Sequence, residues 1–211
     1  KAIGMDKRIG GLFLKAGPGF GGSCFKKDIL NLVYICEHYG LKEVSNYWEQ
    51  VLKINEWQQK RIIQKVLEKL FGTITGKKLA ILGFSFKANT NDTRESPAIK
   101  ICEELLIEGA KLNIFDPKVT YSQIKSCINS NIIQTDNFND PICFSKEETI
   151  QKAVEGVDGI IAITDWEDFS KINWEELSKL VRKPCWIFDT RSIINKKEAE
   201  KNNFNIWQLG S

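Results

Sequence analysis

The sequence predicts an α/β protein in which a helical segment is followed by an open parallel sheet. A broad apolar stripe over residues 43–71 is typical of one long helix. From residue 78 onward, short apolar runs alternate with helical patterns, which is typical of βαβ units and a parallel sheet. The pattern changes at residues 72–78, a stretch rich in glycine and threonine. We therefore expect one domain over residues 1–73 and a second over residues 74–211.

Composition narrows the class of protein. The 211 residues are 42% apolar and 27% charged, which is typical of an ordinary folded chain. The net charge of +3, without long Lys/Arg runs, argues against a nucleic-acid surface, and no apolar run is long enough to cross a membrane. The six cysteines form no C-x-x-C pair, so they match neither a zinc site nor a disulfide scaffold. We expect reduced thiols, no metal and a cytoplasmic location.

Two helices are predicted in the first part of the chain. Helical periodicity runs from residue 26 to 39 and again from residue 43 to 71, and a glycine follows each stretch. An unbroken helix of the second length protrudes from a small domain and needs a surface to pack on. That surface belongs either to its own subunit or to a second copy of the chain.

The second part is predicted to contain four strands, over residues 78–86, 111–115, 159–164 and 185–189. Helical patterns lie between them, over residues 97–108, 151–154 and 174–180. Residues 120–148 hold many Asn, Ser and Asp residues with little periodicity, and we expect them to form a surface excursion that carries no chemistry.

A glycine-rich run delivers one cysteine to the start of the first helix. Cys24 follows Gly19–Ser23 and precedes Lys26 and Lys27. A helix N-terminus and neighbouring lysines both favour the thiolate, which is the nucleophilic form of cysteine. Asp28 lies one helical turn further on, where a carboxylate can activate a water molecule. The alternative is that Cys24 is a small buried residue at a tight turn.

The sequence argues against two other interpretations of this region. Gly17, Gly19 and Gly22 fit the spacing G-x-G-x-x-G, but no second strand with a terminal acidic residue follows, so we reject a dinucleotide site here. His38, the single histidine, lies about four turns along the helix that Cys24 begins, roughly 20 Å away. This distance argues against a Cys-His dyad of the protease type.

Basic and aromatic residues follow two of the predicted strands. Phe86 and Lys87 come at the end of the first strand, Arg94 precedes the next helix, and Arg191 follows the last strand. Ligands of open α/β sheets bind beyond the carboxyl ends of the strands, and such side chains suit a diphosphate. The alternative for each is a solvated basic side chain. The first βα turn has only Gly83, so this sheet is a poor candidate for binding NAD.

These segments resemble the UDP-glucose/GDP-mannose dehydrogenase family, and its UDP-glucose 6-dehydrogenases in particular. The residues that carry the resemblance are Phe-Leu-Lys-Ala at 13–16, Gly-Phe-Gly-Gly-Ser-Cys-Phe-Lys-Lys-Asp at 19–28, Leu-Gly-Phe-x-Phe-Lys at 82–87 and Asp-Thr-Arg-Glu-Ser at 92–96. The resemblance implies a central helical dimerisation domain followed by a Rossmann-like UDP-binding domain. The family places its NAD-binding domain before these two. We therefore expect this chain to be a central and C-terminal fragment that is inactive alone.

The resemblance also implies roles for individual residues. Cys24 is implied as the nucleophile and Asp28 as the residue that assists water. The implied NAD contacts are Cys24, Phe25, Lys27 and Arg94. The implied contacts to UDP-glucose are Arg8 (reaching a neighbouring subunit), Phe13, Leu14, Lys15, Gly19, Phe20, Gly21, Phe25, Phe86, Lys87 and Arg191.

The implied reaction oxidises UDP-glucose to UDP-glucuronate in two hydride transfers to NAD, through a thiohemiacetal and a thioester on Cys24. The family supplies oxyanion donors and a general-base glutamate from residues before this segment. Two alternatives remain open. A related dehydrogenase acts on GDP-mannose or on UDP-N-acetyl sugars, although the N-acetyl branch usually has histidine where this chain has Ser23. The other is a non-catalytic module for nucleotide-sugar binding and dimerisation.

Overall fold

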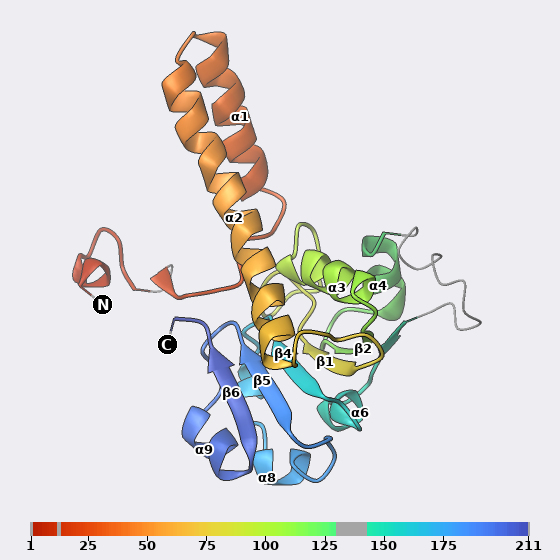
Figure 1. The fold of residues 1–211 in the computed structure, drawn as a ribbon. Helices are drawn as coiled ribbons and strands as arrows, with labels where there is room; N and C mark the ends of the chain where they lie inside the picture. Colours follow the sequence, from red (N-terminus) through yellow and green to blue (C-terminus); the bar gives the residue numbers. More distant parts are fainter. Residues whose placement is uncertain (1, 12–13, 130–142, 211) are drawn as a thin grey trace.

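A helical hairpin projects from an α/β body (Figure 1). The computed structural model describes residues 2–11, 14–129 and 143–210. A short 3₁₀ helix, η1 (Ile3–Met5), precedes the hairpin helices α1 (Phe25–His38) and α2 (Lys42–Lys69). With 28 residues, α2 is about 42 Å long at 1.5 Å per residue. Both helices lie within two residues of their predicted bounds, and α2 protrudes as its length requires.

Within the residues that the structure describes, the body contains a parallel sheet of six strands in the order β3-β2-β1-β4-β5-β6. The order reverses direction at the β1/β4 pair, which is the topology of a Rossmann-like sheet. The predicted α/β fold class is therefore confirmed. The strands are β1 (Lys78–Leu82), β2 (Lys111–Phe115), β3 (Phe144–Lys146), β4 (Gly159–Ala162), β5 (Cys185–Asp189) and β6 (Phe204–Gln208).

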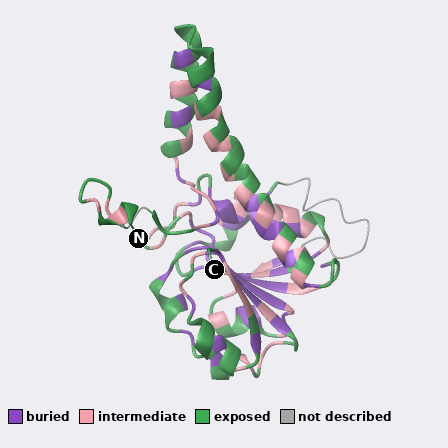
Figure 2. Ribbon diagram, turned by 60° about the vertical axis from the view of Figure 1, so that its left-hand side comes forward, coloured by how far each residue is buried: buried purple, intermediate pink, exposed green. Residues whose placement is uncertain are grey.

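Helices cover both faces of this sheet (Figures 1 and 2). Besides the C-terminal part of α2, they are α3 (Pro97–Ile107), α4 (Tyr121–Cys127), α6 (Ile150–Val154), α7 (Glu167–Ser170), α8 (Trp174–Leu177) and α9 (Lys196–Lys201). No helix in the described ranges combines the length and the apolar character needed to cross a bilayer.

Residues 120–148, predicted as a surface excursion, contain two short elements in the part that the structure describes. Helix α4 begins with a capping box between Thr120 and Gln123, and β3 pairs with β2. Both elements are too short to produce a recognisable period. The strand predicted to end at residue 86 ends at Leu82, because the chain turns at Gly83 with a φ of +91°. The strand predicted to end at residue 164 ends at Ala162.

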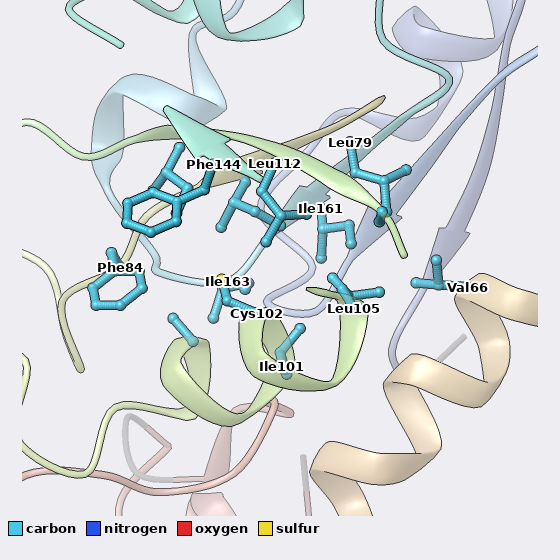
Figure 3. Packing of buried hydrophobic residues seen from close by; sticks show 14 of the residues in the cluster. Val66, Leu79, Phe84, Ile101, Cys102, Leu105, Leu112, Phe144, Ile161 and Ile163 are labelled. Carbon is cyan, nitrogen blue, oxygen red and sulfur yellow. The ribbon is translucent and has the colours of Figure 1, made fainter. Parts of the chain in front are cut away.

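The strands alternate between two hydrophobic layers. Leu79 and Ile81 of β1 face α2 and α3, whereas Ala80 and Leu82 face α6 to α9. Figure 3 shows the first layer, in which Val66 of α2 lies beside residues of α3 and the sheet. The C-terminal part of α2 therefore belongs to the sheet's core, while its N-terminal part pairs with α1.

Candidate active site

Cys24 lies exposed at the N-terminus of α1. It occupies the N-cap position with φ −95° and ψ −57°, and its carbonyl accepts the Asp28 N–H at 2.9 Å. The first N–H groups of a helix have no intrahelical partner, so the thiol lies at the positive end of the helix dipole. Asp28 is also exposed, in the first turn. Because Cys24 is exposed, it is not the small buried residue of the alternative interpretation.

The glycine segment before Cys24 packs on the loop that follows β1. The Gly22 N–H donates to the Arg94 carbonyl at 2.8 Å. A Cβ atom at Gly21 would overlap the Glu95 carbonyl oxygen, and one at Gly22 would lie 3.0 Å from the Phe86 ring. Only residues without side chains allow this approach. Residues about 70 positions apart in the chain are thereby brought into contact beside Cys24.

The opposite side of the same segment packs on α2. The Asn55 side chain accepts the Phe20 N–H at 2.8 Å and donates to the Phe20 carbonyl at 3.2 Å. Gln58 donates to the Gly17 carbonyl at 3.1 Å. The Phe20 ring contacts the Phe25 ring edge-on at a centroid distance of 4.6 Å. The segment is therefore held between one helix and the carboxyl end of one strand.

The basic residues predicted at the strand ends lie near this segment. The Lys87 ammonium lies 5.3 Å from the centre of the Phe86 ring, and Lys87 is exposed. The Arg191 Nε donates to the Ile163 carbonyl at 2.7 Å, and its Nη1 would lie 2.9 Å from a Cβ atom at Gly17. Burial lowers the pKa of the Arg191 guanidinium, partly opposed by Asp165, but arginine remains charged in proteins. Arg191 is thus held beneath the glycine segment.

Arg94 lies beside Cys24 on the solvent side of the segment. Its guanidinium is 68% exposed and pairs with Asp92 at 2.7 Å. The hydrogen bonds that the Arg94 guanidinium donates to Asp92 raise the pKa of Arg94, with a smaller contribution from Cys24. A hollow of about 520 Å³ adjoins this point and is lined by Ser23, Lys26, Lys27, Leu30, Arg94 and Glu95. Among its charged residues, Lys26 and Glu95 pair with each other at 2.9 Å, while Lys27 is exposed.

The N-terminal segment stays apart from this cluster (Figure 1). Arg8 is exposed and pairs with its neighbour Asp6 at 2.6 Å, which raises the pKa of Arg8. Leu14 and Lys15 are exposed as well. Phe13 lies outside the described residues. Of the residues that the resemblance implies as substrate contacts, Arg8 is therefore not brought to the site within one copy of the chain.

Asp116, at the end of β2, has a structural role. Its carboxylate is buried and accepts the N–H groups of Phe84, Ser85, Lys118 and Val119 at 2.8 to 3.0 Å. These bonds occupy the acidic side chain that could otherwise resemble the ribose-binding acid of a NAD site. They fix the turn after β1, from which Phe86 projects.

The amides of α2 were not predicted as site residues. Asn55, Gln58 and Gln59 interrupt the apolar stripe of α2 at spacings of three and four residues. Gln59 is buried, and its Nε2 would lie 3.4 Å from a Cβ atom at Gly19. Polar residues on the inward face of a helix need partners. That mismatch with the stripe is the sequence signal that could have identified them.

Comparison with known proteins gives the family. The model of the UDP-glucose/GDP-mannose dehydrogenase family UDP binding domain matches residues 80–196, and the model of that family's central domain matches residues 1–57. The chain belongs to the UDP-glucose/GDP-mannose dehydrogenase family. Cys24 lies within the central-domain match of this family, and Phe86, Lys87, Arg94 and Arg191 lie within the UDP binding domain match.

Several family members are similar over the whole of this chain. UDP-glucose 6-dehydrogenase 4 of Oryza sativa subsp. japonica is 41% identical over 217 residues, which cover 99% of this chain and 45% of that protein. UDP-glucose 6-dehydrogenase of Drosophila melanogaster is 41% identical over 220 residues, with 100% of this chain and 44% of that protein covered. The chain thus spans about half the length of the curated relatives it matches.

Solved structures of the family share the fold. A UDP-glucose dehydrogenase from the archaeon Pyrobaculum islandicum superposes with a TM-score of 0.73 at 29% identity, over 99% of this chain and 41% of that one. GDP-mannose dehydrogenase from Pseudomonas aeruginosa superposes with a TM-score of 0.63 at 22% identity, over 92% of this chain and 41% of that one. The second likeness concerns the fold alone.

Proposed function

We propose that this chain supplies the nucleophile and the UDP-sugar-binding half of an NAD-dependent UDP-glucose 6-dehydrogenase. One observation carries the proposal: an exposed cysteine at a helix N-terminus is docked beside Phe86 and Arg94 at the carboxyl end of β1. That edge of a parallel sheet is where such folds bind ligands. In this proposal residues 1–73 form the catalytic and dimerisation domain, and residues 74–211 form the UDP-binding domain.

The substrate side of the site offers donors for a diphosphate and a sugar. Lys87 and Arg191 supply positive charge, and Arg191 is held in place by its bond to the Ile163 carbonyl. Phe86 offers an aromatic face, and the backbone of Gly19–Gly21 allows a ligand to approach closely. Phe25 at the start of α1, Phe13, Leu14 and Lys15 of the segment before the glycines, and Arg8 reaching from a neighbouring copy of the chain complete the set that we propose to bind UDP-glucose.

The proposed role of Cys24 begins at the aldehyde produced by the first oxidation. The thiolate adds to the C6 carbonyl carbon, the oxygen takes a proton, and a thiohemiacetal forms. Loss of hydride from C6 and of the hydroxyl proton yields a thioester. Water then adds to the thioester carbonyl with Asp28 accepting its proton, and the thiol leaves as the carboxylate of UDP-glucuronate forms.

NAD is the cofactor of this proposal, and the residues lining the hollow next to Cys24 suit it. Lys27 and Arg94 present cationic groups to that hollow beside the apolar side chain of Leu30, a donor set that fits a pyrophosphate with an adjoining ring. When bound, NAD supplies the hydride acceptor for both oxidations. Cys24 and Phe25, at the start of α1, are proposed to face it.

The helical hairpin is proposed to pair with a second copy of the chain. Large apolar side chains are exposed on both helices and on the turn between them, and Figure 2 colours most of the hairpin as exposed. They are Leu30, Tyr34, Ile35, Tyr39, Leu41, Val44, Tyr47, Ile54 and Trp57. Exposed apolar area of this extent marks an interaction site in soluble proteins. Sedimentation is expected to show a dimer that Tyr47→Glu dissociates; a monomeric wild type would contradict this.

Calorimetric titration with UDP-glucose tests the substrate proposal. The chain is expected to bind UDP-glucose more tightly than GDP-mannose. Lys87→Ala is expected to weaken binding about tenfold, because a bond to a charged group contributes about 1.5 kcal/mol or more. Lys125→Ala, which removes an exposed lysine on α4, is the matched control. Absence of UDP-glucose binding at millimolar concentration, or a preference for GDP-mannose, would overturn the assignment.

A further inference from the structure

The side-chain amide of Asn55 pairs with the backbone of a single residue four positions before Cys24. Its oxygen accepts the Phe20 N–H at 2.8 Å and its nitrogen donates to the Phe20 carbonyl at 3.2 Å. Both bonds are part-buried and both need the amide in one orientation, because reversing it would place donor against donor and acceptor against acceptor. Asn55 therefore satisfies both backbone groups of Phe20, as a neighbouring strand would.

The contacts around Phe20 leave the Asn55–Phe20 pair as the main link between residues 17–24 and α2. On the α2 side, Gln58 bonds only the Gly17 carbonyl, and Gly19 lies against Asn55 itself: a Cβ atom there would be 2.5 Å from the Asn55 oxygen. On the far side the Gly22 N–H bonds the Arg94 carbonyl. The Phe20 ring then packs on Phe25, the first residue of α1.

We infer that Asn55 is a positioning residue, which fixes residues 17–24 between α2 and the loop after β1 and so sets where Cys24 and the sugar-facing glycines lie. The inference rests on the proposed function for its consequence in substrate binding. Its structural basis is independent of that function, since α2 is anchored in the sheet core by Ile62 and Val66 only two turns further on. Asn55 transfers that fixed position to a segment of glycines that has little stiffness of its own.

Substitution by aspartate tests the inference through pH. Asn55→Asp has the same shape, but an ionised carboxylate can only accept, so it faces the Phe20 carbonyl without a donor. A protonated carboxyl restores the donor. Part burial beside a carbonyl favours the neutral form of the new carboxyl, whereas the ammonium groups of Lys26, Lys60 and Lys100, which line the same hollow as Asn55 together with Glu56 and Glu95, favour its ionised form. Protection is therefore compared at about pH 7.5 and at about pH 3.5, below the usual carboxyl pKa of about 3.9. Residue-resolved hydrogen exchange of the Phe20 amide, corrected for intrinsic rates, is the measurement.

The expected result is about a tenfold loss of Phe20 protection in Asn55→Ala at both pH values, and in Asn55→Asp near pH 7.5 only. UDP-glucose affinity is expected to fall in parallel in each case. Gln64→Ala, which removes an exposed amide of the same helix, is expected to change neither. If Asn55→Ala does not fold, the Phe20 protection of Asn55→Asp at the two pH values is sufficient to test the inference.

Unchanged Phe20 protection in Asn55→Asp across this pH range would overturn the inference. So would equal loss in Asn55→Asp and Asn55→Ala at low pH, which indicates a role of packing alone. A wild-type chain that binds no UDP-glucose would instead overturn the proposed function, and the Phe20 amide would still decide the role of Asn55.

Discussion

Gly21 gives the sharpest test of how the cysteine segment is docked. A Cβ atom at this position would overlap the Glu95 carbonyl oxygen, and it would lie 3.0 Å from the carbonyl carbon and 3.1 Å from Pro97 Cδ. These partners are backbone and a proline ring at the start of α3, so they cannot rotate away. Gly21→Ala must therefore lift the segment, and the neighbouring bond from Gly22 to the Arg94 carbonyl, now 2.8 Å, is lost with it.

The expected magnitude follows from these contacts. Overpacking costs about 1–3 kcal/mol and the lost hydrogen bond about 1 kcal/mol. A loss of about 2 kcal/mol raises the population of the undocked segment roughly 30-fold. Hydrogen exchange followed by mass spectrometry should show this in peptides covering residues 17–24, with the sheet unaffected. Gly11→Ala is the control, because nothing lies within 4 Å of a Cβ atom there. Exchange in residues 17–24 that matches the wild type would refute the docking argument.

Three further predictions concern the intact chain. Alone, it should not reduce NAD with UDP-glucose in a steady-state absorbance assay; sustained turnover would contradict the expectation that this chain needs further residues. Alkylation of the native chain, followed by peptide mass spectrometry, should show that exposed Cys24 is modified before Cys102 and Cys185. The reason is that burial raises the pKa of Cys102 and raises that of Cys185 to about 12. Labelling of Cys102 before Cys24 would be inconsistent with the burial of Cys102. Hydrogen bonds from Arg94 lower the pKa of Asp92 from 3.8, so its stabilisation is present above that pH and lost as pH falls through the lowered value. The difference in melting temperature between wild type and Asp92→Asn should therefore shrink in strong acid, and a difference that grows there would reverse the sign of the argument.

Local patterns predicted much of this structure, and long-range contacts explain what they missed. The strands at residues 111–115 and 185–189 were predicted with their observed bounds, because each is a compact apolar run between turn residues. Strand β6 was missed because Asn205 and Gln208 dilute its pattern, although it pairs with β5 along its full length. The start of α1 at Cys24 was predicted, since a glycine run and a helical period meet there.

The residues of the candidate site also divide into those that local patterns predicted and those that depend on long-range contacts. Phe86, Lys87 and Arg191 were predicted because strand ends can be located from the sequence alone. The contacts of Gly21 and Gly22 with residues 86–95 were not, because nothing in either segment specifies its partner. The amides of α2 were missed because a helix's inward face is identified by its apolar residues, and polar residues on that face acquire meaning only when their partners are known.

The geometry around Cys24 depends on the sheet core more than on the segment that contains the cysteine. The C-terminal part of α2 and the loop after β1 are both fixed to the first hydrophobic layer, through Val66 and Phe84. Asn55 and the Arg94 carbonyl are thereby held at a constant separation, and the glycine segment spans that separation with backbone alone. A core substitution that shifts α2 against the sheet, such as Val66→Ala, should therefore disturb the cysteine segment without touching it. Gly21→Ala should disturb the same segment by direct contact. The two substitutions can be distinguished, because only Val66→Ala should also lower the hydrogen-exchange protection of α3.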